Sequence, residues 1–343
     1  NSRSTASSAL GGLSSRALVL GIPYGALALA WPVCLLVQDS MPLWALSLPL
    51  LVSMIVLGLP HGALDHRVLY RMRGGAGKRR ERAGLLGLYL TAAAAYLVVW
   101  YLLPVAAFAF FIILTALHWG DGDRFALSET GQGAYPAGPF SQLAFIALRG
   151  AVPMLFPLAF YPEVFATVAN WSIQLFSTQA VSAAAIGKAA PFALGLWGLS
   201  AVAFWLTQAA GGDREAHRGL RRDIAETALL GLFFASVHPL LSVGLYFTLW
   251  HSLRHIDRLR LTLRETPAEP LPLRKLWQWS LPMTGAALLL LAALGLALAV
   301  TLQNVGSVLG VYLVLIACLT LPHALVVARQ DSCEDKEHRP GGV

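Results

Sequence analysis

Apolar segments of about twenty residues, the length that a membrane-crossing helix needs, recur from one end of this chain to the other. Of its 343 residues, 57% are hydrophobic and only 13% are charged. The charged share is well below the roughly 25% typical of soluble domains. The runs are continuously apolar and do not alternate with a period of two residues, which argues against a membrane β-barrel. The sequence therefore predicts an all-α, polytopic integral membrane protein.

We expect about ten transmembrane helices packed into one bundle, with eight spans and one re-entrant pair as the alternative. The approximate ranges are 17–38, 43–67, 84–103, 105–122, 140–160, 189–210, 223–237, 240–262, 276–302 and 306–328. Pro104 and His238-Pro239 separate two of the neighbouring pairs, because proline cannot continue a preceding helix. Residues 1–343 are predicted to form a single domain, with 1–16 and 330–343 as flexible tails.

The distribution of Lys and Arg gives this topology a direction. With ten spans, the basic clusters at 71–82, 214–222 and 254–275 fall on the same side as both termini. Loops rich in Lys and Arg remain in the cytoplasm. We therefore predict a multi-pass protein of the cell membrane, inner or plasma, with both termini cytoplasmic. These loops also account for the net charge of +7 without a nucleic-acid partner.

Five of the nine histidines lie toward the ends of even-numbered predicted spans: His61, His118, His251, His255 and His323. These spans run in one direction, so the five side chains are expected at a similar depth. His251 and His255 are four residues apart and share one face of a helix. Histidine is the commonest metal ligand, and helical bundles build metal sites from facing helices. A shared metal site is therefore favoured over five separate hydrogen-bonded histidines.

Carboxylates accompany these histidines. Asp65 follows His61 by one turn and can accept the second N–H of a ligand histidine, which fixes the tautomer. After His118, Asp123 or Asp121 can do the same, and either can instead cap the next turn. For His323, metal ligation and a hydrogen bond within the bundle are equally good interpretations. Imidazole ligands with few carboxylates suit iron, zinc or copper, and the chain has no HExxH or GxSxG motif.

Four short motifs then point to a known family. They are Gly58-Leu59-Pro60-His61-Gly62-Ala63-Leu64-Asp65, His118-Trp119-Gly120 with Asp123, Trp250-His251-Ser252-Leu253-Arg254-His255, and Leu321-Pro322-His323. Over residues 20–330 the chain resembles the membrane β-carotene cleavage enzymes related to bacteriorhodopsin-related protein, the Brp/Blh family. It departs from the family pattern in two places, since Trp119 stands where Phe is as common and His66 is additional.

The resemblance implies a β-carotene 15,15′-dioxygenase that splits the central double bond with O2 into two molecules of all-trans-retinal. It implies non-haem Fe(II) held by His61, His118, His251 and His255. Three further residues are expected to support the ligands rather than exchange protons: Asp65, Asp123 and His323. The resemblance also implies a functional link to a retinal-binding rhodopsin.

The substrate of such an enzyme is an apolar molecule dissolved in membrane lipid. We therefore expect it to reach the metal laterally, between helices. Four aromatic side chains are expected to line its tunnel: Trp119, Tyr246, Phe247 and Trp250.

Two other functions fit the histidines less well. A membrane di-iron desaturase or hydroxylase uses more histidines, in HxxxH and HxxHH boxes, whereas this chain has one HxxxH pair. A metal transporter is expected to distribute its ligands through the depth of the membrane. The histidines here are predicted to lie at one level.

Overall fold

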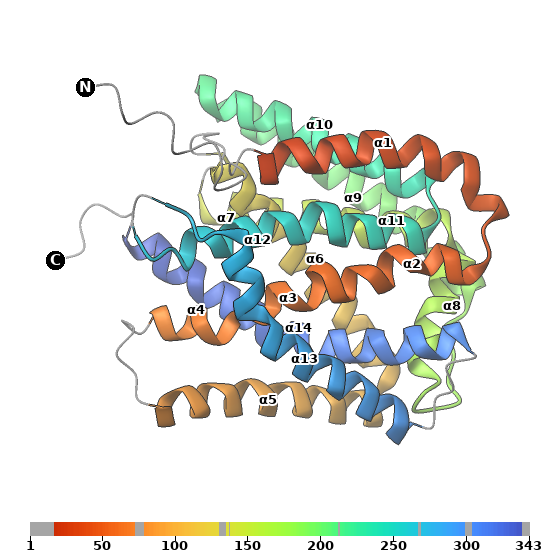
Figure 1. The fold of residues 1–343 in the computed structure, drawn as a ribbon. Helices are drawn as coiled ribbons and strands as arrows, with labels where there is room; N and C mark the ends of the chain where they lie inside the picture. The colour runs from red at the N-terminus through yellow and green to blue at the C-terminus, as the bar shows by residue number, and fades with distance from the viewer. Residues whose placement is uncertain are drawn as a thin grey trace.

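The regular structure is helical throughout the part of the chain that the structure describes (Figure 1). The computed structural model describes residues 17–72, 79–129, 135–136, 138–211, 213–266, 269–298 and 304–337. These residues confirm the predicted all-α class. The expected tail at 1–16 lies outside the described residues. The boundary expected at residue 330 falls inside the last helix, which continues to Glu337.

Eight helical segments in the described ranges are long and apolar enough to cross a membrane. Two of them combine α-helix with tighter or wider helical turns. The segment Ala17–Ser40 contains α1 (Ile22–Val37). The segment Leu43–Met72 contains α2 (Leu43–Ser53), α3 (Leu59–Gly62) and α4 (Asp65–Met72). The others belong to single helices: α5 (Arg79–Leu102), α6 (Pro104–Glu129), α7 (Pro139–Phe160), α9 (Ala183–Gly211), α13 (Leu273–Ala297) and α14 (Val305–Glu337). The chain is therefore a multi-pass membrane protein.

Two of the ten expected spans, 223–237 and 240–262, are helical but are not among these eight. The first lies in α10 (Arg214–Ser236), and the second is divided into α11 (Pro239–Tyr246) and α12 (Ser252–Thr262). Charged residues such as Arg222, Glu226 and Arg254 interrupt the apolar sequence of these two segments, and these charges pair with one another inside the protein. The structure therefore confirms a polytopic bundle but not a count of ten. The remaining helix, α8 (Pro162–Ile173), packs against α14 and α9.

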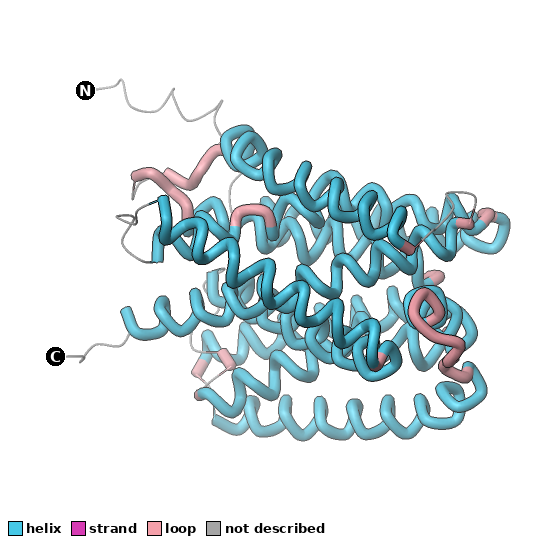
Figure 2. Tube along the Cα trace, turned by 90° about the horizontal axis from the view of Figure 1, so that it is seen from below, coloured by secondary structure: helices cyan, strands magenta, loops and turns pink. Residues whose placement is uncertain are grey.

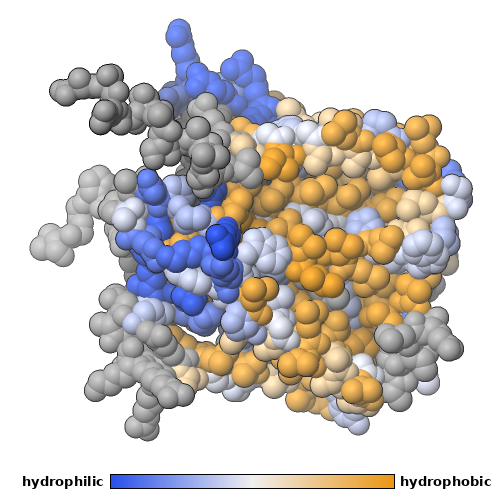
Figure 3. Space-filling view, in the orientation of Figure 1, coloured by the Kyte–Doolittle hydropathy of each residue, from blue (hydrophilic) through white to orange (hydrophobic). Residues whose placement is uncertain are grey.

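The surface of the bundle divides into an apolar band and a hydrophilic end (Figure 3). The hydrophilic end, which we call the polar end, carries the start of α10, the end of α4 and the turn between α12 and α13 (Figure 1). Figure 2 shows most connecting loops gathered at the two ends of the bundle. This division is the one that a bilayer requires of a spanning protein.

Helices α6 and α7 approach each other closely because each carries glycine at the contact. A Cβ atom at Gly150 would collide with the carbonyl oxygen of Ala116, and one at Gly120 would collide with that of Ile146. Small residues allow membrane helices to pack backbone against backbone, where van der Waals contact replaces the missing hydrophobic drive. This contact fixes the position of His118 on α6.

We predict that Gly150→Ala destabilises the protein by about 1–3 kcal/mol, because its methyl group forces the two backbones apart. The measurement is unfolding of the detergent-solubilised protein by denaturant or heat. Gly195→Ala is the matched control, since Gly195 lies in α9 with no atom within 4 Å of the added Cβ. Equal stability of the two variants would contradict the assigned role of the contact.

Candidate metal centre

Four helical segments bring the five histidines into one buried cluster. His61 comes from α3, His118 from α6 and His323 from α14, and all three are buried. His251 ends the π-helical turn Phe247–His251 and His255 lies one turn later in α12. We call these five side chains the histidine cluster. π-helical turns within α-helices occur often at functional sites.

The imidazole rings lie close together from several directions. The ring centroids of His118 and His323 are 4.7 Å apart, and those of His118 and His251 are 5.0 Å apart. His61 lies 5.1 Å from both His255 and His323. The predicted similarity of depth thus corresponds to direct proximity in space.

Four of the five histidines have one buried ring nitrogen with no protein partner among the described residues. The Nε2 atoms of His118, His251, His255 and His323 are buried, and none has a hydrogen-bond partner among the described residues. Ligand atoms of His61, His118 and His323 all lie within 4.8 Å of one another. A buried polar atom without a partner is unfavourable. Converging imidazole nitrogens suit a transition metal such as iron, zinc or copper.

Asp65 contacts His323 rather than the nearer histidine in sequence. The Nδ1 atom of His323 lies 2.9 and 2.8 Å from the two carboxylate oxygens of Asp65, and Tyr89 donates a hydrogen bond to the same carboxylate at 3.1 Å. A proton on Nδ1 satisfies this contact and leaves Nε2 free as a metal ligand. The sequence expectation that Asp65 supports a histidine therefore has a structural counterpart in His323. His61 instead places Nδ1 3.0 Å from the carbonyl oxygen of Leu57.

Three glycines lie directly beside aromatic rings of the site. The ring of His323 lies over Gly62, where an added Cβ would be 3.7 Å from Nδ1. The ring of His251 lies over Gly122, where an added Cβ would be 3.4 Å from Nδ1 of His251. A Cβ at Gly58 would come within 2.7 Å of the Phe247 ring. An added Cβ at Gly62 or Gly122 would be in van der Waals contact with the histidine ring, whereas one at Gly58 would force the Phe247 ring or the neighbouring backbone to move.

Asp123 contacts a different set of side chains from the one expected. It accepts hydrogen bonds from Arg254 at 2.7 Å, Arg149 at 2.8 Å and the Trp250 indole at 3.0 Å. No hydrogen bond joins it to a histidine among the described residues. Arg254 and Trp250 flank His251 in sequence, so Asp123 of α6 ties α6 to the segment that carries two of the histidines.

Asp123 belongs to a buried ion network that also includes Glu226 of α10. Glu226 pairs with Arg149, with Arg254 at 3.2 Å and with Arg222 at 2.9 Å. Asp223, one turn earlier, accepts hydrogen bonds from Tyr135 at 2.7 Å and Trp205 at 2.8 Å. The network contains three arginines and three carboxylates: Arg149, Arg222, Arg254, Asp123, Asp223 and Glu226.

Burial and the neighbouring Asp223 carboxylate raise the pKa of Tyr135 above its usual value. The Tyr135 hydroxyl therefore keeps its proton and donates throughout the physiological pH range. The balance of charges in the network, together with such neutral donors, allows the carboxylates to remain buried.

Sequence reasoning did not assign roles to Arg149, Glu226 or Arg254. Arg149 had the clearest signal, because an arginine in the middle of an apolar span needs a partner. Arg254 lies inside the third motif between two histidines. Glu226 lies in a predicted span, and nothing in the sequence indicates which arginines it pairs with.

An apolar cavity runs along the histidine cluster. The volume of this cavity is about 250 Å³. His61, His118, His251 and His323 line it, together with side chains of α5, α6, α7, α8, α11, α13 and α14. The expected tunnel residues divide into two pairs. Trp119 and Phe247 line the cavity, while Tyr246 and Trp250 do not.

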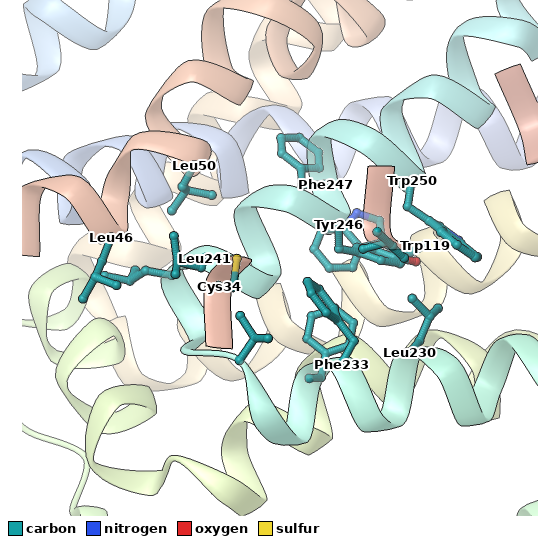
Figure 4. Packing of buried hydrophobic residues seen from close by; sticks show 14 of the residues in the cluster. Cys34, Leu46, Leu50, Trp119, Leu230, Phe233, Leu241, Tyr246, Phe247 and Trp250 are labelled. Carbon is teal, nitrogen blue, oxygen red and sulfur yellow. The ribbon is translucent and has the colours of Figure 1, made fainter. Parts of the chain in front are cut away.

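Tyr246 and Trp250 instead pack behind the cavity wall. Figure 4 shows Tyr246 beside Trp119 and Trp250 farther along the same turn. The Trp119 ring lies 5.0 Å from that of Tyr246 and stacks on Phe247 at 5.9 Å. It also lies 5.6 Å from the ring of His251. Trp119 and Phe247 therefore form an aromatic surface between the hydrophobic core and the histidine cluster.

The fold and the site define a class of protein: a polytopic α-helical membrane protein whose buried histidine cluster borders an apolar cavity. Comparison with known sequences assigns it further. Residues 52–331 match the profile of the family described as beta-carotene 15,15′-dioxygenase, and the chain belongs to this family.

Three relatives illustrate the match. The chain is 36% identical to the probable beta-carotene 15,15′-dioxygenase Blh of Halobacterium salinarum, over 82% of this chain and 84% of the relative. It is 30% identical to the probable beta-carotene 15,15′-dioxygenase Brp of the same organism, over 68% and 64%. It is 29% identical to the beta-carotene 15,15′-dioxygenase of uncultured marine bacterium 66A03, over 60% and 67%. No solved structure gives a significant match.

The ion network makes a prediction about stability. Arg149→Met leaves Asp123 and Glu226 short of a buried positive charge and should cost about 3–5 kcal/mol. Lys275→Met is the control, because Lys275 pairs with Glu265 at 2.6 Å where the two side chains are 38% and 58% exposed. Its loss should cost at most about 1 kcal/mol. Unfolding in detergent measures both, and a small effect of Arg149→Met would contradict the structural importance of the network.

Proposed function

We propose that this protein is a β-carotene 15,15′-dioxygenase, which uses O2 to split the central double bond into two molecules of all-trans-retinal. One O2 supplies one oxygen atom to each aldehyde, so no other reductant or oxidant is consumed. The observation that supports the proposal is the position of the histidine cluster in the wall of an apolar cavity. A hydrocarbon substrate needs such a cavity, and cleavage by O2 needs a metal beside it. The named relatives support the choice of substrate.

The cofactor in this proposal is non-haem Fe(II). The imidazoles of His61, His118, His251 and His255 would hold it, and the geometry of His323 supports its inclusion among the ligands. Iron supplies the redox chemistry that allows O2 to react with an alkene. Asp65 holds His323 in one tautomer and orientation. The role proposed for Asp123 is indirect, since it fixes the segment carrying His251 and His255 through Trp250 and Arg254.

The remaining cavity residues act by position and by excluding water. A polyene has no polar atom by which the protein could fix its register. The length and shape of the cavity must therefore select the double bond that lies beside the histidines. Trp119 and Phe247 present flat apolar surfaces next to His251 and His61, respectively. These contacts would keep the reacting carbons of the polyene close to the histidine cluster.

We further propose that both termini and the basic loops face the cytoplasm, because exposed arginines of the end of α4, the start of α10 and the turn between α12 and α13 gather at the polar end. This orientation, in the cell membrane, would place the histidine cluster in the cytoplasmic half of the bilayer. Retinal released there would be available to a retinal-binding rhodopsin in the same membrane.

The decisive experiment measures product and metal together. Purified protein supplied with Fe(II), O2 and β-carotene should yield two retinal molecules per β-carotene and contain one iron per chain. His251→Ala and His323→Ala should each lose most of the bound iron and at least about 100-fold in activity, because each removes a converging ligand. Two irons per chain would favour a di-iron desaturase or hydroxylase. Metal uptake into proteoliposomes without retinal formation would favour a transporter.

We propose that β-carotene reaches the cavity from the bilayer between α5 and α13. Leu90 of α5 and Leu290 of α13 line the cavity, and they are also 45% and 46% exposed. Helix α14 packs against both helices and contributes the inner wall, including Ile316. Figure 1 shows α5 and α13 along the same side of the bundle. An apolar opening here would let the substrate move from lipid to the histidine cluster without crossing water.

Bulky substitutions test this portal. Leu90→Trp and Leu290→Trp should lower kcat/KM for β-carotene severalfold and slow its uptake without O2, because the indole narrows the opening. Leu88→Trp and Leu289→Trp are matched controls, since these neighbours are 69% and 74% exposed and do not line the cavity. Substrate uptake is measured by β-carotene absorbance retained after washing. The same loss in all four variants, or in none, would reject this portal.

A further inference from the structure

One hydroxyl group in the cavity wall has no protein partner. Thr115 lies on α6 three residues before His118, so the two side chains share a face of the helix. Its side chain is only 4% exposed, and it lines the same cavity as His118. Among the described residues, none forms a hydrogen bond with its Oγ1 atom.

Two buried threonine hydroxyls, those of Thr115 and Thr284, have no hydrogen-bond partner among the described residues, and of these two only Thr115 lines the cavity. In helices a threonine hydroxyl commonly donates to the carbonyl oxygen one turn earlier. Thr320 does so to Ile316 at 2.7 Å, and Thr248 does so to Gly244 at 2.7 Å. Thr320 is the closest comparison, because it also lines the cavity and lies three residues before a histidine of the cluster, His323. A buried hydroxyl without a partner is unfavourable, so the Thr115 hydroxyl is suited to a ligand.

The chemistry of the proposed reaction identifies which ligand this hydroxyl could bind. β-Carotene is a hydrocarbon and has no atom that accepts a hydrogen bond from Thr115. Retinal has one, the aldehyde oxygen, and this oxygen lies on the carbon at which the chain is cut. It therefore first appears beside the histidine cluster, and Thr115 lies one helical turn from His118.

We propose that the Thr115 hydroxyl donates a hydrogen bond to the aldehyde oxygen of one retinal molecule, so that Thr115 forms a product subsite in the cavity. The inference rests on the proposed function, because that function supplies the aldehyde. No covalent bond is made or broken in this step. The hydrogen bond distinguishes product from substrate, and it holds the aldehyde end at the histidine cluster until that retinal leaves.

Equilibrium titration in the dark, without β-carotene, tests the subsite. Wild-type protein in detergent is titrated with all-trans-retinal and with the matching hydrocarbon that carries a methyl group in place of the aldehyde. Binding is followed by quenching of tryptophan fluorescence. Thr115→Val should weaken retinal binding roughly three- to tenfold, the effect of one hydrogen bond, and should leave hydrocarbon binding unchanged. Thr115→Ser should retain the preference for retinal.

Thr320→Val is the matched control and should change neither affinity, because the Thr320 hydroxyl already has a backbone partner. Unchanged retinal affinity in Thr115→Val would overturn the proposal. Equal weakening of both ligands would also overturn it, since that result indicates lost packing rather than a lost hydrogen bond. Formation of retinal by the wild-type protein is assayed separately. A failure of the proposed function is therefore distinguished from a failure of the subsite.

Discussion

The structure depends on how the chain satisfies polar groups that it buries among apolar helices. A buried polar group without a partner is unfavourable where water is excluded, and an unpaired buried charge is more unfavourable still. In this chain the buried charges and the buried imidazoles lie in two separate clusters. Buried charges pair in the network around Arg149, Arg254 and Glu226, and the buried Arg258 and Arg260 pair with Asp331 and Asp257. Its imidazoles gather in the histidine cluster, where several nitrogens have no protein partner among the described residues. The first arrangement supports the fold, and the second leaves donor atoms for a metal ion.

The class of fold and the grouping of the histidines could be predicted from the sequence, because both follow from patterns along the chain. Apolar length gives the spans, and the direction of each span gives the depth of His61, His118, His251, His255 and His323. Contacts between helices do not follow from such patterns. The sequence placed Asp65 near His61, but only packing of α14 against α4 brings Asp65 to His323.

The count of spans and the tunnel residues show the same limit. The segments 223–237 and 240–262 were expected to be apolar spans, but α10 and α12 carry buried charged residues whose pairing depends on contacts between helices. Trp119, Tyr246, Phe247 and Trp250 are equally aromatic in the sequence. Because of the rotation of each helix, Trp119 and Phe247 reach the cavity, whereas the Trp250 indole donates a hydrogen bond to Asp123. That rotation depends on packing with helices distant in the sequence.

The segment that carries His251 and His255 shows how the two polar systems depend on each other. Trp250 and Arg254 are four residues apart, as are His251 and His255, so each pair occupies one face of the helix and the faces are adjacent. Asp123 binds both Trp250 and Arg254, and a one-residue change in the rotation of the segment would exchange these side chains for the histidines. The buried charges therefore set the direction in which the two imidazoles point. Since Asp123 and His118 belong to the same helix, the same contact also fixes the distance between the α6 histidine and the other two.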